Sequence, residues 1–308
     1  MEKKLKVTVS PHITSSLTVT GMMRDVVIAL LPAAGYSVYL WGAGVLKIYA
    51  ASIIFAYVSE WVFLKIRKRE FVNDGSVLVT GILFAMVLPP EIPLYCVAFG
   101  VTFGVVFGKQ FFGGLGHNVF NPALLGRAFL TASFPVLMTS WISPLDAATT
   151  ATPLGAWKFS GEMWETGRIF FGNCPGCLGE TSAFLLLLGG LYLIVRKTID
   201  YRIPLAYIGT VFLVSGVYYL FNANAATPFF HIFAGGLLLG AFFMATDPVT
   251  APANGKGRLI FGIGCGIFTL VIRYFSGYPE GVMFSILLMN AFSPLLEKIP
   301  PGPAFGEL

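Results

Sequence analysis

The stretch SVLVTGILFAMVLPPEIPLYCVAFGVTFGVVFGKQFF, residues 76–112, decides the fold class of this chain. It consists of two apolar segments, 76–88 and 94–112, separated by a proline-rich turn. A helix needs about 20 mostly apolar residues to cross the roughly 30 Å hydrocarbon core of a bilayer, so the second segment is long enough to span a membrane. The first is too short and ends at Pro89, which predicts a broken helix.

Segments of this kind recur along the chain and predict an all-α integral membrane protein with about ten transmembrane helices. Hydrophobic residues make up 56% of the sequence and charged residues 11%, whereas a soluble domain carries about 25% charged residues. The net charge of +5 does not indicate nucleic-acid binding, because no basic run is interleaved with aromatic residues. The expected spans are residues 22–42, 45–64, 76–88, 94–112, 123–138, 178–195, 203–221, 229–244, 259–273 and 281–296.

Lysine and arginine predict the orientation of these helices, because short cytoplasmic loops carry an excess of both residues. One side of the expected topology collects most of them, and the other side has only Lys47, Lys158, Arg168 and Arg273. Both termini are therefore expected in the cytoplasm, and the long connection 139–177 on the exterior face. Residues 1–10 lack the apolar core and cleavage site of a signal peptide, so we expect the first helix to act as the insertion signal.

The halves of the chain resemble each other, which predicts two five-helix units. GILFAMVLPP (81–90) matches GAFFMATDPV (240–249), and VFNPALL (119–125) matches NAFSPLL (290–296). Because five is odd, the copies must cross the membrane in opposite directions, as an inverted repeat whose broken helices meet near the midplane. The alternative is that apolar helices simply look alike. The expected parts are a cytoplasmic segment 1–21, a first repeat 22–138, an exterior loop 139–177, a second repeat 178–296 and a cytoplasmic tail 297–308.

The exterior loop contains DAATTATPLG, residues 146–155, which is rich in small and hydroxyl side chains. Taken alone, it is typical of a turn in which Asp146 caps a backbone amide and Pro153 holds Thr152 in an extended conformation.

The same stretch also resembles the D-x-x-[ST]-x-A-T acceptor motif of flavin transferases, which move FMN from FAD onto a threonine hydroxyl as a phosphodiester. The chemistry requires an unhindered hydroxyl on a flexible, extended chain. Thr150 stands where the usual S-G-A-T-P-L context has glycine, but the A-T-P register favours Thr152. The matching residues are the acid Asp146, the hydroxyl residue Thr149, the small residue Ala151, the acceptor Thr152, and the following Pro153 and Leu154.

The resemblance to a known family extends over nearly the whole chain. FGGLGHNVFNPALLGRAF (112–129), ATPLG (151–155), GETS (179–182) and FMATDPVTAP (243–252) resemble a type of membrane subunit shared by two kinds of complex. It is the D-type subunit of Rnf complexes and the B-type subunit of Na+-translocating NADH:quinone oxidoreductases. The short segment before the first helix favours the Rnf type over the quinone reductase type.

This resemblance implies a flavoprotein subunit of a complex that couples ferredoxin:NAD oxidoreduction to translocation of Na+ or H+ in the cell inner membrane. It implies FMN on Thr152 and a second flavin, riboflavin, bound without a covalent bond. The implied partners are a flavin-bearing G-type subunit, A- and E-type membrane subunits, NAD- and ferredoxin-reactive subunits, and a flavin transferase. Candidate flavin or ion contacts are polar residues near the predicted breaks: Asn121, Arg127, Thr246 and Asp247. Alternatively, Arg127 and Asp247 cap helix ends.

Other readings of the chain are possible from its residues. Cys174 and Cys177 form a C-x-x-C pair, for which a disulfide or two inert thiols is favoured over a metal site. Lys158 and Arg168 are either near the tethered phosphate or solvated, and Glu60 and Lys47 belong either to an ion path or to helix ends. The rival functions are a solute transporter or channel, and a flavin-free scaffold protein within the complex.

Overall fold

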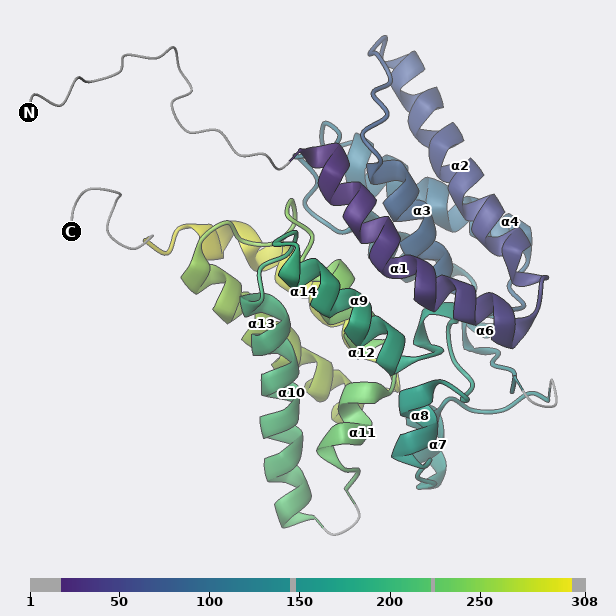
Figure 1. Cartoon of the computed structure of the whole chain (residues 1–308), viewed down its shortest axis with the longest axis vertical. Coiled ribbons are helices and arrows are strands. Elements are labelled where there is room, and N and C mark those ends of the chain that lie inside the picture. Colours follow the sequence, from purple (N-terminus) through teal and green to yellow (C-terminus); the bar gives the residue numbers. More distant parts are fainter. Residues whose placement is uncertain (1–17, 145–147, 223–224, 301–308) are drawn as a thin grey trace, which may run out of the picture.

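The structure is a computed structural model that describes residues 18–144, 148–222 and 225–300. These residues form a bundle of helices joined by turns and loops (Figure 1). They contain no extended sheet, and a single isolated antiparallel bridge joins Ile142 to Thr149. The predicted all-α fold class is therefore confirmed.

The predicted apolar segments correspond to helices, several of which are interrupted. In the first half they are α1 (Val19–Trp41), α2 (Val45–Ile66), α3 (Ser76–Met86), α4 (Leu94–Phe103) continued by η1 (Gly104–Gln110), and α5 (Pro122–Ser133) followed by α6 (Pro135–Thr139). In the second half they are η2 (Leu178–Glu180) with α9 (Ala183–Val195), α10 (Arg202–Phe221), α11 (Pro228–Phe233) with α12 (Leu237–Leu239) and η3 (Gly240–Met244), α13 (Gly255–Phe275) and α14 (Val282–Glu297).

Four of the described helices, α1, α2, α10 and α13, are long and apolar enough to cross a membrane. The shorter apolar helices are α3, α4 with η1, α9 and α14. Large apolar side chains project outward from the long helices, for example Leu220 (81% exposed) and Phe275 (85% exposed). In water such exposure would be costly, so these surfaces suit a lipid environment. The chain is a multi-pass membrane protein.

The segment 76–88, predicted as a broken helix, and the segment 229–244 of the second half are both interrupted. In the first half, α3 ends at Met86, three residues before Pro89, because a proline cannot continue the hydrogen-bond ladder. In the second half, Gly235 and Gly236 separate α11 from α12 with φ angles of 73° and 65°. Glycine adopts this left-handed backbone without a steric penalty. At Gly235 two factors disfavour any side chain: the positive φ angle, and a collision of the added Cβ with Leu154.

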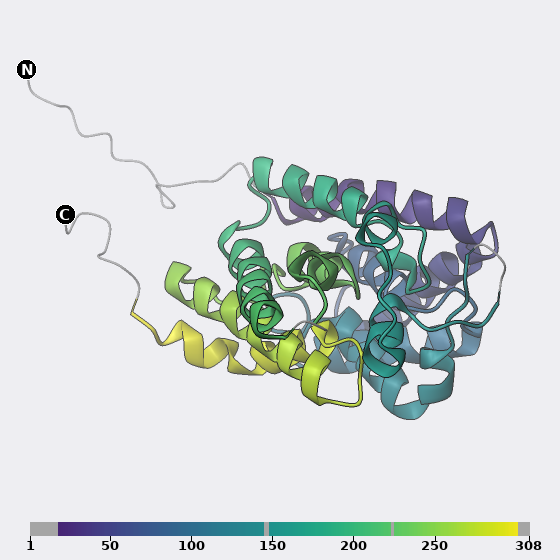
Figure 2. The same ribbon diagram turned by 90° about the horizontal axis from the view of Figure 1, so that it is seen from below.

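The two halves repeat the same helix neighbours. In the first half α2 packs against α4 and α4 against α5, while in the second half α10 packs against α13 and α13 against α14. Between the halves, α1 and α9 pack side by side (Figure 2). The pair of related units stays a prediction.

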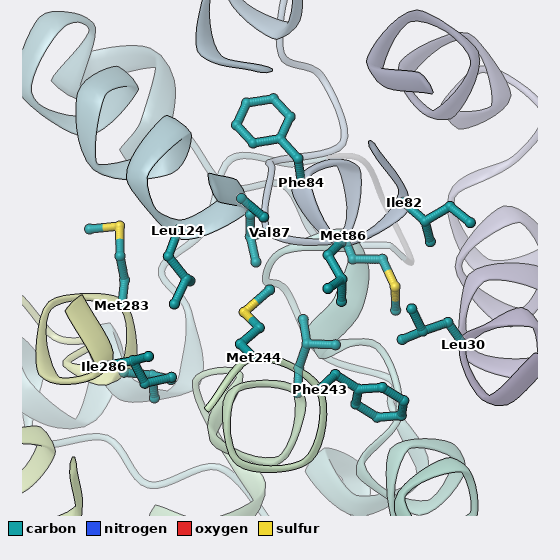
Figure 3. Packing of buried hydrophobic residues seen from close by; sticks show 14 of the residues in the cluster. Leu30, Ile82, Phe84, Met86, Val87, Leu124, Phe243, Met244, Met283 and Ile286 are labelled. Atoms are coloured by element: carbon teal, nitrogen blue, oxygen red, sulfur yellow. The ribbon is translucent and has the colours of Figure 1, made fainter. Parts of the chain in front are cut away.

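The interrupted segments converge in the centre of the core. Figure 3 shows Met86 and Val87, at the end of α3, with Met244, at the end of η3, among buried apolar side chains. The side-chain amide of Asn121 donates a hydrogen bond to the main-chain oxygen of Met244 at 3.4 Å. The residue that precedes α5 is thereby joined to the end of η3, 123 positions later in the sequence.

Candidate functional site

The segment predicted as a flavin acceptor begins with a short hairpin. The Thr150 N–H donates to the Trp141 carbonyl at 3.0 Å, and the Ser143 N–H donates to the Ala148 carbonyl at 2.9 Å. Thr149 is exposed, whereas Asp146 lies outside the described residues. The acceptor segment is therefore attached through its backbone to the chain that follows α6.

Thr152 ends the extended part of this segment and caps the next helix, α7 (Pro153–Ser160). Its φ and ψ angles of −62° and 158° are extended, as expected for a residue before proline. Its hydroxyl accepts a hydrogen bond from the Gly155 N–H at 3.1 Å. Ala151 is exposed, but Thr152 is only 3% exposed. The expectation of an unhindered acceptor hydroxyl is therefore wrong for this folded conformation.

The 139–177 connection, expected to be a loop, contains α7 and a second short helix, α8 (Thr166–Phe171). Thr152 starts α7 because its hydroxyl satisfies an otherwise unpaired N–H, and Pro153 suits the first helical position. Gly161 ends the helix in a left-handed conformation with φ of 73°. The predicted acceptor Thr152 is thus at the N-terminus of an ordered helix.

A lysine on α7 fixes this helix to the second half of the protein. Lys158 Nζ donates to the main-chain oxygens of Ile272 (3.4 Å), Arg273 (2.7 Å) and Tyr278 (3.1 Å), and also to that of Ser276. These carbonyls lie at the C-terminal end of α13, where a positive charge is favourable. Lys158 therefore contacts carbonyls and is not available as the suggested phosphate contact.

Apolar contacts hold the rest of α7 in place. Leu154 is 1% exposed and belongs to a small cluster with Phe230. The Trp157 ring meets those of His231 and Tyr274 edge to face, with centroids 5.0 and 5.6 Å apart. By contrast, Arg168 on α8 forms only a largely exposed pair with Glu165.

A second candidate site is an interior cavity of about 80 Å³ at the convergence of the broken segments. It brings together Asn121, Thr246 and Asp247, which come from opposite halves of the sequence. The Asp247 carboxylate accepts the Val249 N–H at 3.1 Å, within a turn and not at the start of a helix, so the capping alternative is wrong for this residue. Most of the remaining wall is apolar and includes Met22, Val26, Leu83, Leu193, Phe242 and Phe243.

Lys109 and Asn118, two buried polar residues that line this cavity, were not predicted as site residues, whereas Glu60 beside them was singled out from the sequence. Lys109 Nζ lies 2.9 Å from Glu60 Oε2 and donates to the Ser76 hydroxyl at 2.7 Å. The Lys109 and Glu60 side chains are 3% and 5% exposed. Asn118 Oδ1 is buried and has no hydrogen-bond partner among the described residues. The signal for Lys109 was present, as a lone charge inside an apolar run.

Arg127 does not join the other three predicted contacts. Its Nη2 donates to Glu280 Oε2 at 2.5 Å and to Cys177 Sγ at 3.3 Å. Cys177, Glu180 and Glu280 place one ligand atom each within 4.8 Å of one another. Because the guanidinium already contacts two of these three groups, a metal ion there would meet its positive charge at short range.

The C-x-x-C pair is not a disulfide in this structure. Cys174 and Cys177 are both buried free thiols. Burial raises the pKa of the Cys174 thiol to about 12, so it stays protonated at neutral pH and is a poor nucleophile. Of the two outcomes favoured from the sequence, inert thiols are the one that the structure has.

Comparisons with known proteins give a consistent result. The model of the NQR2, RnfD, RnfE family matches residues 6–306. The D-type subunit of the proton-translocating ferredoxin:NAD(+) oxidoreductase complex of Clostridium ljungdahlii is 45% identical over 316 residues, covering 96% of this chain and 95% of that protein. The corresponding subunit of the Na(+)-translocating complex of Acetobacterium woodii is 43% identical over 312 residues, covering 99% and 96%. That of an ion-translocating oxidoreductase complex of Halorhodospira halophila is 35% identical, covering 93% and 91%.

Proposed function

This chain belongs to the NQR2, RnfD, RnfE family, and from that premise we propose that it is the D-type membrane subunit of an ion-translocating ferredoxin:NAD+ oxidoreductase complex. Two relatives that match over almost their full lengths carry that activity in their names, one with protons and one with Na+ as the ion. The chain is then one part of a translocating oxidoreductase and not an enzyme by itself.

In this complex, Thr152 carries FMN as a phosphodiester. The observation that carries this proposal is the position of Thr152 at the N-cap of α7, within the A-T-P-L context. A phosphate ester formed at Thr152 Oγ1 has its negative charge at a helix N-terminus, which favours anions through its free N–H groups and its dipole. FMN supplies the electron transfer, and the chain supplies position and polarity.

The attachment takes place before α7 reaches its final position. The Thr152 hydroxyl is hydrogen-bonded and the residue is 3% exposed, so a flavin transferase has no access to it in the folded conformation. The exposed neighbours Thr149 and Ala151 present the rest of the motif on the surface. Pro153 and Leu154 complete the motif at the start of α7, and Asp146 supplies its acid.

The interior cavity is the proposed site of the second, non-covalent flavin. Its wall is mostly apolar, and the unpaired Asn118 Oδ1 offers an acceptor for a ring N–H or a ribityl hydroxyl. Asn121, Thr246 and Asp247 are the other contacts in this wall, whereas Arg127 belongs to a different cavity.

The proposed topology has ten membrane-crossing segments in two inverted repeats, 22–138 and 178–296, with cytoplasmic termini and the acceptor segment on the exterior face. Short, interrupted segments such as α3 are compatible with this topology because neighbouring helices bury their ends. The partners are the other subunits of the complex, among them a G-type flavin subunit and the A- and E-type membrane subunits, together with a flavin transferase.

Mass spectrometry of the chain purified from its native host tests the proposal. The peptide that contains Thr152 is expected to carry the mass of FMN, and denatured protein is expected to show flavin fluorescence in a gel. Thr152→Ala is expected to remove both signals. A chain without flavin, purified from cells with an active flavin transferase, would instead favour a transporter or a flavin-free scaffold. Quinone reduction by the flavin-loaded complex would point to the quinone reductase type.

A further inference from the structure

A separate cavity lies between α5 and α6 on one side and the turn from α13 to α14 on the other. It is partly open to its surroundings. It differs from the interior cavity in both position and lining. Its wall consists of Arg127, Thr131, Met138, Thr139, Trp141, Tyr278, Pro279, Glu280, Met283 and Phe284.

The acceptor segment is bonded to this cavity on both sides of Thr152. Two residues before Thr152, the Thr150 N–H donates to the main-chain oxygen of Trp141 at 3.0 Å. Six residues after it, Lys158 Nζ donates to the main-chain oxygen of Tyr278 at 3.1 Å. Trp141 and Tyr278 both line the cavity, and they belong to different halves of the protein. Contacts on either side of Thr152 thus join the acceptor segment to residues of the cavity wall.

The lining has the chemistry that a flavin ring requires. Trp141, Tyr278 and Phe284 supply aromatic surface, and the rings of Tyr278 and Phe284 lie 5.3 Å apart. The polar part of the wall is the pair of Arg127 and Glu280, whose side chains are 12% and 17% exposed. A guanidinium carries five N–H donors, and the Arg127 contacts to Glu280 and Cys177 both come from Nη2.

We propose that this cavity is the docking site of the isoalloxazine ring of the flavin tethered at Thr152, with Arg127 donating to the pyrimidine half of the ring. The inference rests on the proposed function, because it takes the FMN on Thr152 as given. Glu280 positions Arg127. The guanidinium favours the negative charge that a reduced flavin ring acquires, so Arg127 raises the reduction potential of this flavin.

Fluorescence of the tethered flavin tests the position of the ring. The full chain is produced together with a flavin transferase, and FMN on Thr152 is verified by peptide mass before each measurement. Indole in contact with a flavin quenches its emission, so Trp141→Phe is expected to increase the flavin emission of the native chain severalfold. Trp157→Phe is the matched control, because Trp157 lies on the acceptor helix but does not line this cavity.

The reduction potential tests the role of Arg127. In Arg127→Gln the two-electron potential is expected to fall by at least about 30 mV, which corresponds to a tenfold shift in the oxidised-to-reduced ratio. Arg127→Lys keeps the positive charge, so its reduction potential is expected to fall less than that of Arg127→Gln. If Arg127→Gln does not fold, Tyr278→Leu and Phe284→Leu test the same cavity through flavin emission and anisotropy.

The two proposals fail in different ways. Absence of FMN from Thr152 would overturn the proposed function. With FMN attached, an emission unchanged by Trp141→Phe, or increased equally by Trp157→Phe, would show that the ring lies elsewhere. A potential unchanged in Arg127→Gln would remove Arg127 from contact with the ring.

Discussion

Lys109 Nζ lies 2.9 Å from Glu60 Oε2, and neither side chain is more than 5% exposed. The pair joins η1 to α2, and Ser76 at the start of α3 accepts a further hydrogen bond from the same ammonium group. Three segments of the first half are thus joined at one buried charge pair, beside the interior cavity. Ionised groups at such depth are costly unless they are paired.

Removing one partner of this pair is expected to destabilise the chain strongly. Lys109→Met leaves the Glu60 carboxylate buried without its counter-charge, at a cost of about 3–5 kcal/mol. The double variant Lys109→Met, Glu60→Gln is expected to recover much of that loss, because no buried charge remains. Thermal unfolding of the parent, the two single variants and the double variant in detergent gives the coupling between the two residues. Equal losses in the single and double variants would contradict this account.

The hydroxyl of Thr152 is expected to serve both as acceptor and as helix cap. Thr152→Ser keeps an oxygen at the same place and is expected to retain FMN. Thr152→Ala is expected to lose FMN and also about 1 kcal/mol of stability, the usual cost of removing a cap. Peptide mass and thermal unfolding report the two effects separately. Thr150→Ala serves as the control, and loss of FMN there would move the acceptor to Thr150.

Lys158 is expected to hold α7 against α13. Lys158→Met leaves its four carbonyl partners without the ammonium group, and a buried acceptor that loses its partner costs about 1–3 kcal/mol. We expect limited proteolysis to cleave near α7 earlier than in the parent chain. Arg168→Met removes an equal charge from the same connection but only an exposed ion pair, so unchanged proteolysis is expected there. Similar cleavage of both variants would argue against the docking role.

The buried thiol of Cys174 predicts a loss of stability in alkali. Its pKa is raised by burial from 9.0 to about 12, so the folded state holds this proton more tightly than the unfolded state does. The resulting stabilisation is complete below pH 9 and is lost as the pH rises toward 12, with a slope of at most about 1.4 kcal/mol per pH unit. Cys174→Ser is expected to lack this component. The difference between the two chains in denaturant unfolding at about pH 8 and about pH 10 measures it, and parallel curves would contradict it.

Filling the interior cavity is expected to remove only the non-covalent flavin. Leu83 lines this cavity, so Leu83→Trp is expected to abolish the flavin released by acid precipitation while FMN on Thr152 remains in the pellet. Leu213→Trp is the control, because Leu213 is 66% exposed on α10. Retention of releasable flavin in Leu83→Trp would place the second flavin outside this cavity.

The positions of the helices could be predicted from the sequence, but the second helix break and the burial of Thr152 could not. Apolar runs locate the helices, because a segment of hydrocarbon-compatible residues has few alternatives to helix in a bilayer. Pro89 located one helix break in advance. The second break was not predicted at its place, because it lies at a pair of glycines with positive φ angles and not at a proline. The A-T-P-L motif predicts Thr152 as the acceptor, and this stays a prediction; the motif gives no sign of the burial of Thr152.

By itself, the sequence determined the all-α membrane class and the family, since these depend on composition and on the order of neighbouring residues. Only the tertiary structure decided which polar groups meet. Asn121 and Thr246 share one cavity while Arg127, on the same helix that Asn121 caps, contacts Glu280 in another. Lys109 likewise has its counter-charge 49 positions away. Such pairings depend on how the helices pack in three dimensions, and sequence separation carries no record of that packing.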